Sequence, residues 1–327
     1  MAESQVEAPE AGWPIPHQVV EGTRNTPLAH VEVWAWSLAV GLLARLPRPL
    51  LNAFEAGFAR LAKLLDRRHA RSARVFLRQA FGPSLSDREI ESRVAAAYAH
   101  LLEVALTPAR FERRFGKRPG ALLERTEVVL SDDVRAVLAG GGCVAVSAHI
   151  GDWEMAARII SEVGFRPFYA ISKPSRNLPL SRLHQRLRED GGIRLVPRRG
   201  AMAFAPTIVA AGGSLGMLLD QRARKKPVLA PLFGRLARSD RSVGVLLRRL
   251  KCPVVFVAAY RTGDLRWRFV ADRVLYPEDV VGLTPEAIAA WINHELERQI
   301  LAAPEQYFWL HDRYRDTPET SDPTETL

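Results

Sequence analysis

The clearest chemical signal in the sequence lies where an apolar run meets a helical pattern, at residues 143–160, CVAVSAHIGDWEMAARII. His149, Asp152 and Glu154 stand there within six positions. Helix start signals place Asp152 near the N-cap and Glu154 in the first turn, where both carboxylates suit the helix dipole. A carboxylate in that turn can accept a hydrogen bond from one imidazole nitrogen and leave the other nitrogen its lone pair. Such a histidine is suited to take a proton from an alcohol near neutral pH.

Other chemistries have less support at this junction. The chain has no G-x-S-x-G elbow, and Ser147 stays within the predicted strand, which disfavours a serine nucleophile. A metal site made of His149, Asp152 and Glu154 would need further ligands, and we predict neither a metal nor a cofactor. A histidine that serves only the structure stays an open alternative, because a single His-x-x-x-x-Glu spacing is a weak pattern.

Strand and helix patterns alternate from about residue 122 onward. Strands are predicted at residues 127–130, 143–147, 167–171, 194–197, 215–219, 253–260 and 267–271. Helices are predicted at residues 132–139, 153–163, 180–189, 202–211, 241–250 and 285–301. This alternation predicts an α/β fold with a mostly parallel or mixed sheet flanked by helices. In such sheets ligands bind beyond the carboxyl ends of the strands, and His149 lies at one of these ends.

The 327-residue chain carries a net charge of +10, which indicates an anionic partner such as a phosphorylated substrate, a membrane surface or a nucleic acid. Basic residues gather on the loops predicted after the strands: Lys173, Arg176, Arg198, Arg199, Arg222, Arg224, Lys225, Lys226 and Arg235. We expect them to surround the same sheet edge as His149 and to bind phosphate groups. The two cysteines, Cys143 and Cys252, fit reduced thiols of the core.

The ends of the chain differ from its middle. Residues 1–27 and 316–327 are polar and predict disordered tails around a single domain at 28–315. Residues 33–44 are uncharged, but this run is too short to span a bilayer. Next comes an amphipathic stripe, Leu50, Phe54, Phe58, Leu61 and Leu65, with basic neighbours. Residues 28–66 therefore fit helices that lie on an anionic membrane surface, or equally a stripe that packs on the domain's own core.

Four blocks carry a family resemblance: SAHIGDWE, ISKPSRNLPLSRLHQRLREDGGIRLVPRRG, GMLLDQRARKKPVLAPLFGR and FWLHDRYRDTP. Together they resemble the bacterial lipid A late acyltransferases of the lysophospholipid acyltransferase superfamily, over roughly residues 31–318. The resemblance implies a glycerol-3-phosphate-acyltransferase-like fold with an N-terminal membrane anchor, on the cytosolic face of the inner membrane. It also implies transfer of a fatty acyl chain from acyl carrier protein or acyl-CoA to a hydroxyl of a lipid A-type glycolipid, without an acyl-enzyme.

The resemblance also suggests residue roles. His149 is then the general base and Glu154 its partner, with Asp152 and Gly151 as possible support. Amides near Gly151, or else Lys173 or Arg198, are candidate donors to the oxyanion. The expected substrate-binding residues are Lys173, Arg176, Arg198, Arg199, Asp220, Gln221 and Arg235. The chain departs from the family pattern at Asp152, which replaces the commoner asparagine, and at Lys173, which replaces an arginine.

Three alternatives stay open. The same chemistry could serve a lysophospholipid, an aminolipid or another glycolipid as acceptor. The chain could also be a lipid-binding homologue without activity. A nucleic-acid binder would explain the charge, but no module for nucleic acids is visible in the sequence.

Overall fold

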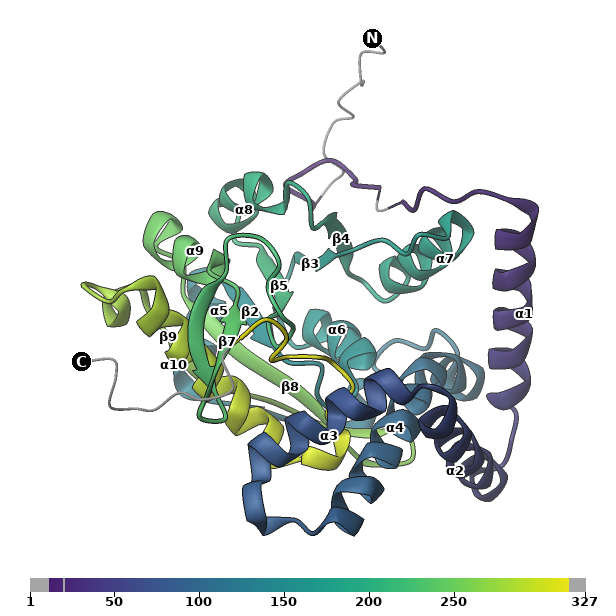
Figure 1. Cartoon of the computed structure of the whole chain (residues 1–327). Helices are drawn as coiled ribbons and strands as arrows, with labels where there is room; N and C mark the ends of the chain where they lie inside the picture. The colour runs from purple at the N-terminus through teal and green to yellow at the C-terminus, as the bar shows by residue number, and fades with distance from the viewer. Residues whose placement is uncertain (1–11, 20, 318–327) are drawn as a thin grey trace.

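The part of the protein that the computed structural model describes, residues 12–19 and 21–317, is built around a seven-stranded sheet (Figure 1). Its strand order is β1-β9-β8-β2-β5-β3-β4. β8 and β9 pair antiparallel, and every other neighbouring pair in this sheet is parallel. The predicted α/β fold is confirmed, and its sheet is of the mixed kind. The strands are β1 (Thr126–Leu130), β2 (Val144–Ser147), β3 (Phe168–Ser172), β4 (Arg194–Pro197), β5 (Ser214–Leu218), β8 (Val254–Gly263) and β9 (Arg266–Leu275).

Helices cover both faces of the sheet. Around β2, Val144 and Val146 belong to one hydrophobic cluster, whereas Cys143 and Ala145 belong to another. Side chains of α3, α4, α8, α9 and α10 fill the first cluster, and α5 and α6 contribute to the second. Both faces are therefore buried, as parallel strands require. The helices are α3 (Arg67–Phe81), α4 (Asp87–Phe115), α5 (Asp132–Gly140), α6 (Trp153–Glu162), α7 (Leu178–Glu189), α8 (Ala201–Ala210), α9 (Ser242–Leu250) and α10 (Pro285–Ala302).

A two-stranded hairpin that the sequence analysis missed packs against α10. It consists of β6 (Val228–Leu232) and β7 (Arg235–Ser239). Its two-residue loop is Phe233-Gly234, and both residues have positive φ, 48° and 73°, as in a type I′ turn. Asn-Gly or Asp-Gly usually marks this turn, whereas a phenylalanine in the loop and a proline within β6 conceal it.

The N-terminal segment differs from the disordered tail that we expected over residues 1–27. Trp13 packs edge-on against the Tyr169 ring of β3 at a centroid distance of 5.2 Å, and Ile15 is buried. The expectation of disorder is therefore wrong for this stretch, because its apolar side chains pack on β3 and join the first hydrophobic cluster. Residues 1–11, 20 and 318–327 of the two predicted tails lie outside the described residues.

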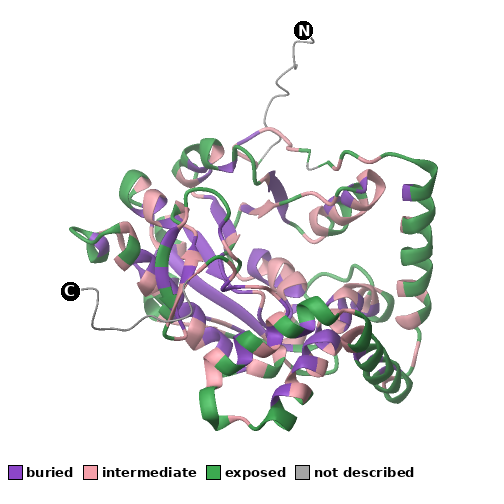
Figure 2. Cartoon of the chain, in the orientation of Figure 1, coloured by how far each residue is buried: buried purple, intermediate pink, exposed green. Residues whose placement is uncertain are grey.

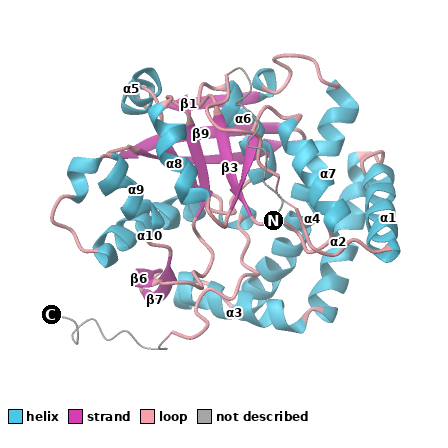
Figure 3. Cartoon of the chain, turned by 90° about the horizontal axis from the view of Figure 1, so that it is seen from above, coloured by secondary structure: helices cyan, strands magenta, loops and turns pink. Residues whose placement is uncertain are grey.

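α1 (Pro27–Leu43) and α2 (Arg48–Leu65) lie together at one side of the molecule (Figure 3). Most of their surface is exposed (Figure 2). Exposed apolar side chains on them are Leu28, Val31, Trp34, Trp36, Leu38, Leu42, Leu50, Phe54, Phe58, Leu61, Leu64 and Leu65. The amphipathic stripe of α2 therefore faces outward, and the alternative in which it packs on the domain's own core is wrong. Within the described ranges, none of the helices has the length and apolar character needed to cross a bilayer.

Phe76 on α3 tests how strongly the aromatic core supports this fold. It is 1% exposed and contacts the rings of Phe233, Tyr307, Trp309 and Tyr314 edge-on. Phe76→Ala should lower the free energy of unfolding by about 3–5 kcal/mol, because it leaves a cavity among these rings. Denaturant titration measures this change.

The neighbouring Val75 supplies the control, since it lies on the same helix and is 44% exposed. Val75→Ala should change the free energy of unfolding by less than about 1 kcal/mol. Equal losses in the two variants would show that the aromatic cluster is not a main support of the fold.

Candidate active site

His149 and Asp220 meet because their strands run side by side. β2 and β5 are parallel neighbours in which Ser147 stands opposite Leu218. His149 and Asp220 each follow two residues beyond this pair, so they leave the same sheet edge at the spacing of adjacent strands, about 4.8 Å. Imidazole Nδ1 and carboxylate Oδ1 are 2.8 Å apart. We expected Asp220 to bind substrate, and the structure makes it the hydrogen-bond partner of the histidine.

This hydrogen bond determines the chemistry of the imidazole. An ionised carboxylate only accepts hydrogen bonds, so Nδ1 carries the proton and Nε2 keeps its lone pair. Burial lowers the pKa of His149, but the charge and hydrogen bond of Asp220 raise it, and the net direction is upward. The His149 side chain is 20% exposed, and its Nε2 lies 3.5 Å from Nε2 of the exposed Gln221. The arrangement suits a general base that receives a proton from outside.

Two aromatic rings flank the imidazole. The ring of Trp153, the first residue of α6, lies 5.4 Å from it between centroids, and that of Phe308 lies 6.0 Å away. The Phe308 amide also donates to the carbonyl oxygen of His149 at 3.0 Å. The imidazole ring is therefore confined on two sides, which limits the directions from which another molecule can approach it.

The segment after α10 contacts the His149–Asp220 pair from the side of Asp220. The Tyr307 hydroxyl donates to Asp220 Oδ2 at 3.1 Å, and the Arg222 amide donates to His311 Nε2 at 2.9 Å. Burial raises the pKa of Asp220, but the charge and hydrogen bonds of His149 and the hydrogen bond from Tyr307 lower it more, so the net direction is downward. Tyr307 and His311 were not predicted as site residues. The only signal was the block that begins at Phe308, and it did not point to Asp220.

Glu154 does not make the hydrogen bond to His149 that the sequence analysis expected. Its carboxylate instead pairs with Arg188 of α7, with Nη2–Oε1 at 2.6 Å and Nε–Oε2 at 3.1 Å. Burial raises the pKa of Glu154, but Arg188 lowers it more, so the net direction is downward. The reason is the register between β2 and β5, which places Asp220 next to His149. The Asp220 carboxylate therefore already accepts the hydrogen bond from Nδ1. Glu154 still acts on His149 through its charge, which favours the protonated imidazole.

Asp152 has a structural role at the start of α6. It is the N-cap, as predicted: its Oδ1 accepts from the Met155 amide and its Oδ2 from Trp267 Nε1, each at 3.2 Å. Burial raises the pKa of this fully buried carboxyl to about 6. With both oxygens engaged, Asp152 does not compete with Asp220 for the imidazole.

The backbone at Gly151 is also fully engaged. Its amide donates to the Gln306 carbonyl and that of Asp152 to the Ala259 carbonyl, each at 2.8 Å. At Gly151, φ is +60°, and a Cβ would lie 2.0 Å from the Ala259 oxygen. The glycine is therefore required for close approach to β8. The expectation that amides near Gly151 stabilise an oxyanion is wrong for these two amides, because both donate within the protein.

The predicted basic residues follow the next strands along the sheet edge. Lys173 comes after β3 and Arg198 after β4, which stand two and three strands from β2, or roughly 10 and 14 Å from it. Lys173, Arg176, Arg198 and Arg199 are all exposed, and none forms an ion pair with a described residue. A row of cations without ion-pair partners among the described residues can bind phosphate groups. The backbone of Arg24 fixes part of the row, because its amide donates to the Arg176 carbonyl at 2.8 Å.

Arg235 does not belong to this row. It begins β7 in the hairpin, and its guanidinium stacks on the Tyr314 ring at 4.9 Å from the centroid. The sequence analysis grouped it with the other cations because it lies in a block that resembles the family. The structure places it on the second, smaller sheet.

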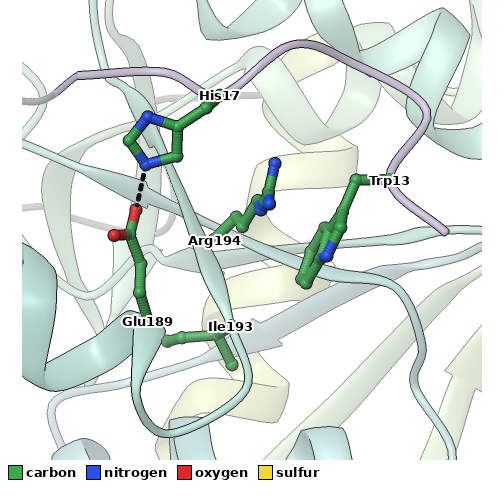
Figure 4. Close-up of a pocket in the computed structure, with 5 residues that line it drawn as sticks. All are labelled: Trp13, His17, Glu189, Ile193 and Arg194. Atoms are coloured by element: carbon green, nitrogen blue, oxygen red, sulfur yellow. Dashed lines mark hydrogen bonds and ion pairs between the residues drawn. The ribbon is translucent and has the colours of Figure 1, made fainter. Parts of the chain in front are cut away.

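Two cavities of the described surface lie apart from the histidine. One of about 370 Å³ is lined by Trp13, His17, Glu189, Ile193 and Arg194, and His17 Nε2 lies 2.7 Å from Glu189 Oε1 (Figure 4). Another, of about 260 Å³, lies between α1 and the loop after β3 and includes Arg176. Neither lining contains His149 or Asp220, so the geometry of the side chains, and not cavity size, identifies the candidate site.

Comparison with known proteins identifies the family of the chain. The family model of bacterial lipid A biosynthesis acyltransferases matches residues 23–316. The chain belongs to this family. It is 25% identical over 319 residues to the lipid A biosynthesis lauroyltransferase of Escherichia coli (strain K12), covering 90% of this chain and 96% of that protein. It is 23% identical over 304 residues to the lipid A biosynthesis palmitoleoyltransferase of the same strain and to the lipid A biosynthesis acyltransferase of Shigella flexneri. These two alignments cover 88% of this chain and 94% of each relative.

The family predicted from the sequence is therefore confirmed, and this acyltransferase is an enzyme of the O-acyltransferase class. The matched residues include His149 and Glu154, the two ends of the His-x-x-x-x-Glu spacing, and also Asp220 and Tyr307. The hydrogen-bonded centre described above thus lies within the segment that defines the family.

The hydrogen bond between His149 and Asp220 yields a test by titration. Asp220→Asn removes a negative charge and an acceptor, so the pKa of His149 should fall relative to the parent acyltransferase. The imidazole signals of His149 in an NMR titration measure this shift, and their loss in His149→Ala assigns them. Asp87→Asn, at an ion pair on the exposed start of α4, is the control and should leave the titration unchanged. A His149 midpoint that stays fixed in Asp220→Asn would contradict the pairing.

Proposed function

We propose that this acyltransferase moves a fatty acyl chain from a thioester donor to a hydroxyl group of a lipid A-type glycolipid, with His149 as the general base. The supporting observation is an imidazole whose Nδ1 is held by Asp220 while Nε2 stays accessible at the end of a row of cations. The family and the printed names of its relatives support the choice of acceptor. Donor and acceptor bind together, because the described residues place no nucleophilic side chain beside the imidazole to carry the acyl group.

The proposed step uses the lone pair on His149 Nε2. The acceptor hydroxyl gives its proton to Nε2 while its oxygen attacks the thioester carbonyl carbon. The tetrahedral intermediate then collapses as the carbon–sulfur bond breaks. The imidazolium returns the proton to the departing thiolate, so the products are an ester and a free thiol. Asp220 keeps the imidazole in the required tautomer and favours the imidazolium while it exists.

Cationic side chains are the best candidates for stabilising the oxyanion. The amides of Gly151 and Asp152 already donate within the protein. Lys173 follows β3, next to the strand that carries Asp220, and its ammonium has no ion-pair partner among the described residues. We assign the oxyanion contact to Lys173 and the more distant phosphates of the acceptor to Arg198 and Arg199.

The exposed apolar sides of α1 and α2 support membrane association. They present tryptophan, phenylalanine and leucine side chains in a protein whose substrate is a lipid. α3 follows directly and exposes Arg67, Arg68 and Arg71, which can contact anionic headgroups. We propose that these helices lie on the cytosolic face of the inner membrane as a peripheral or monotopic anchor, so that the acceptor reaches the site from the bilayer.

The catalytic proposal predicts a large effect at one residue. His149→Ala should lower turnover by about two to four orders of magnitude, because the step loses its general base. The assay follows acyl transfer from acyl carrier protein and from acyl-CoA to a lipid A-type acceptor, with lysophospholipid and aminolipid acceptors in parallel. Near-normal turnover in this variant would overturn the proposal, and transfer only to one of the parallel acceptors would replace lipid A by that lipid.

A matched pair of variants separates the two buried aspartates. Asp220→Asn removes the partner of His149 and should reduce turnover strongly. Asp152→Asn changes the same group in the N-cap, so it should chiefly reduce stability, by about 1 kcal/mol, and affect turnover less. The opposite ranking would transfer the orienting role to Asp152.

Vesicle binding tests the membrane proposal. Replacing Trp34, Leu38, Phe54 and Phe58 by serine should weaken co-sedimentation with anionic vesicles by at least about tenfold, because each side chain contributes apolar area at the interface. Val281→Ser with Leu301→Ser removes exposed apolar side chains elsewhere and is the control. Equal binding of the two proteins would contradict the assignment of α1 and α2.

A further inference from the structure

Arg188 is a residue that neither the sequence motif nor the family comparison singles out. It lies in the last turn of α7 and donates two hydrogen bonds to Glu154, from Nη2 to Oε1 at 2.6 Å and from Nε to Oε2 at 3.1 Å. Its third nitrogen, Nη1, lies 3.4 Å from the Ser172 hydroxyl at the end of β3. Both members of the ion pair are largely enclosed, with side-chain exposures of 28% and 27%. Such a two-pronged contact fixes position and orientation together.

We propose that Arg188 is a positioning residue that holds Glu154 beside His149 and balances its negative charge, so that the imidazole stays neutral and able to accept a proton. The inference rests on the proposed role of His149 as the base. It gives Glu154 a task other than hydrogen bonding to the imidazole, since Asp220 already occupies Nδ1.

The electrostatic surroundings of His149 support this assignment. Burial lowers the pKa of His149, Asp220 and Glu154 raise it, and Arg188 lowers it again. Two carboxylates acting on one imidazole would favour the protonated form, which is useless as a base. The charge of Arg188 opposes that of Glu154. The hydrogen-bonded Asp220 then remains the main charge that favours the protonated imidazole.

The other titratable groups near this cluster do not supply the same balance. His184 on α7 acts on Glu154, and burial lowers its pKa, so it is neutral near pH 7. His311 acts on Asp220 from the C-terminal segment, and burial lowers its pKa to about 4. Tyr307 is also neutral, because burial raises its pKa well above the usual value. Asp152 is faced by Arg261, and Gln221 carries no charge. Arg313 is a buried cation that acts on Asp220 and Tyr307, whereas Arg188 is the cation that acts on the imidazole of His149 itself.

Removing this cation should change the pH dependence in a definite direction. In Arg188→Met the charge of Glu154 acts without opposition, so the pKa of His149 rises by about one unit. A smaller fraction of the imidazole is then neutral at pH 7. The acidic limb of the kcat/KM profile should therefore move to higher pH by the same amount, while activity on the alkaline plateau falls less. In Arg188→Lys the charge is kept, and most of the shift should disappear.

The experiment uses the full chain in detergent micelles and two readouts. The NMR titration of the His149 imidazole gives its pKa without turnover, and the pH profile of acyl transfer gives the kinetic midpoint. Arg186→Met is the matched control, because Arg186 lies on the same helix turn and is exposed without a side-chain partner among the described residues. This control should shift neither midpoint.

Glu154→Gln keeps the proposal testable if Arg188→Met fails to fold. It leaves Arg188 unopposed, so the midpoint of His149 should fall, opposite to the shift in Arg188→Met. A midpoint that stays fixed in both variants while turnover drops would reduce Arg188 to a structural support and overturn the inference. Equal shifts in Arg188→Lys and Arg188→Met would also overturn it, because charge would then not be the cause.

The two proposals fail separately. If His149→Ala stays active while Arg188→Met shifts the NMR midpoint, the general-base assignment fails and the charge balance around the imidazole stands. If His149→Ala is inactive and the midpoint does not move in Arg188→Met, the base stands and the role of Arg188 is wrong.

Discussion

The register between β2 and β5 is the constraint on which the site depends. Ser147 opposite Leu218 brings His149 and Asp220 into contact, because each follows its strand by the same number of residues. A shift of one residue in either strand would turn one of the two side chains to the other face of the sheet. The burial of both sheet faces maintains this register, because a shifted strand would no longer direct its apolar side chains into the hydrophobic clusters on the two faces. The chemistry at the edge is thus secured by packing in the middle of the sheet.

The same sheet edge determines where the charged side chains lie around His149. Asp220 fixes the tautomer, Glu154 and Arg188 form a nearly neutral pair beside it, and Lys173 begins a row of cations. Negative charge is therefore gathered and compensated near the imidazole, whereas uncompensated positive charge lies further along. An anionic ligand would be drawn toward the cations without disturbing the protonation of His149. The exposed apolar helices α1 and α2 extend the protein beyond this edge (Figure 3).

The sequence predicted much of this arrangement, for reasons that can be traced. Hydrophobic periodicity located the strands of the main sheet within about one residue, except that β8 and β9 extend three and four residues beyond their predicted ends. The helix start signals placed Asp152 at the N-cap. Strand order is not encoded locally, however, so Asp220 could not be recognised as the neighbour of His149, although it was predicted as a site residue. Glu154 was expected to hold the imidazole because it is near in sequence, but Arg188, distant in sequence, holds the glutamate instead. The type I′ turn at Phe233-Gly234 was missed because its residue types are unusual for that turn.

The late position of Tyr307, Phe308 and His311 in the chain has a consequence for how the enzyme matures. Tyr307 bonds to Asp220, Phe308 flanks the imidazole, and His311 accepts from the loop beyond β5. During synthesis, β2 and β5 leave the ribosome long before these residues do. A nascent chain can therefore assemble its sheet while the His149 ring still lacks the flanking ring of Phe308. The surroundings of His149 are therefore complete only when translation is almost finished, and a prematurely terminated chain ending before Tyr307 would carry the histidine without them.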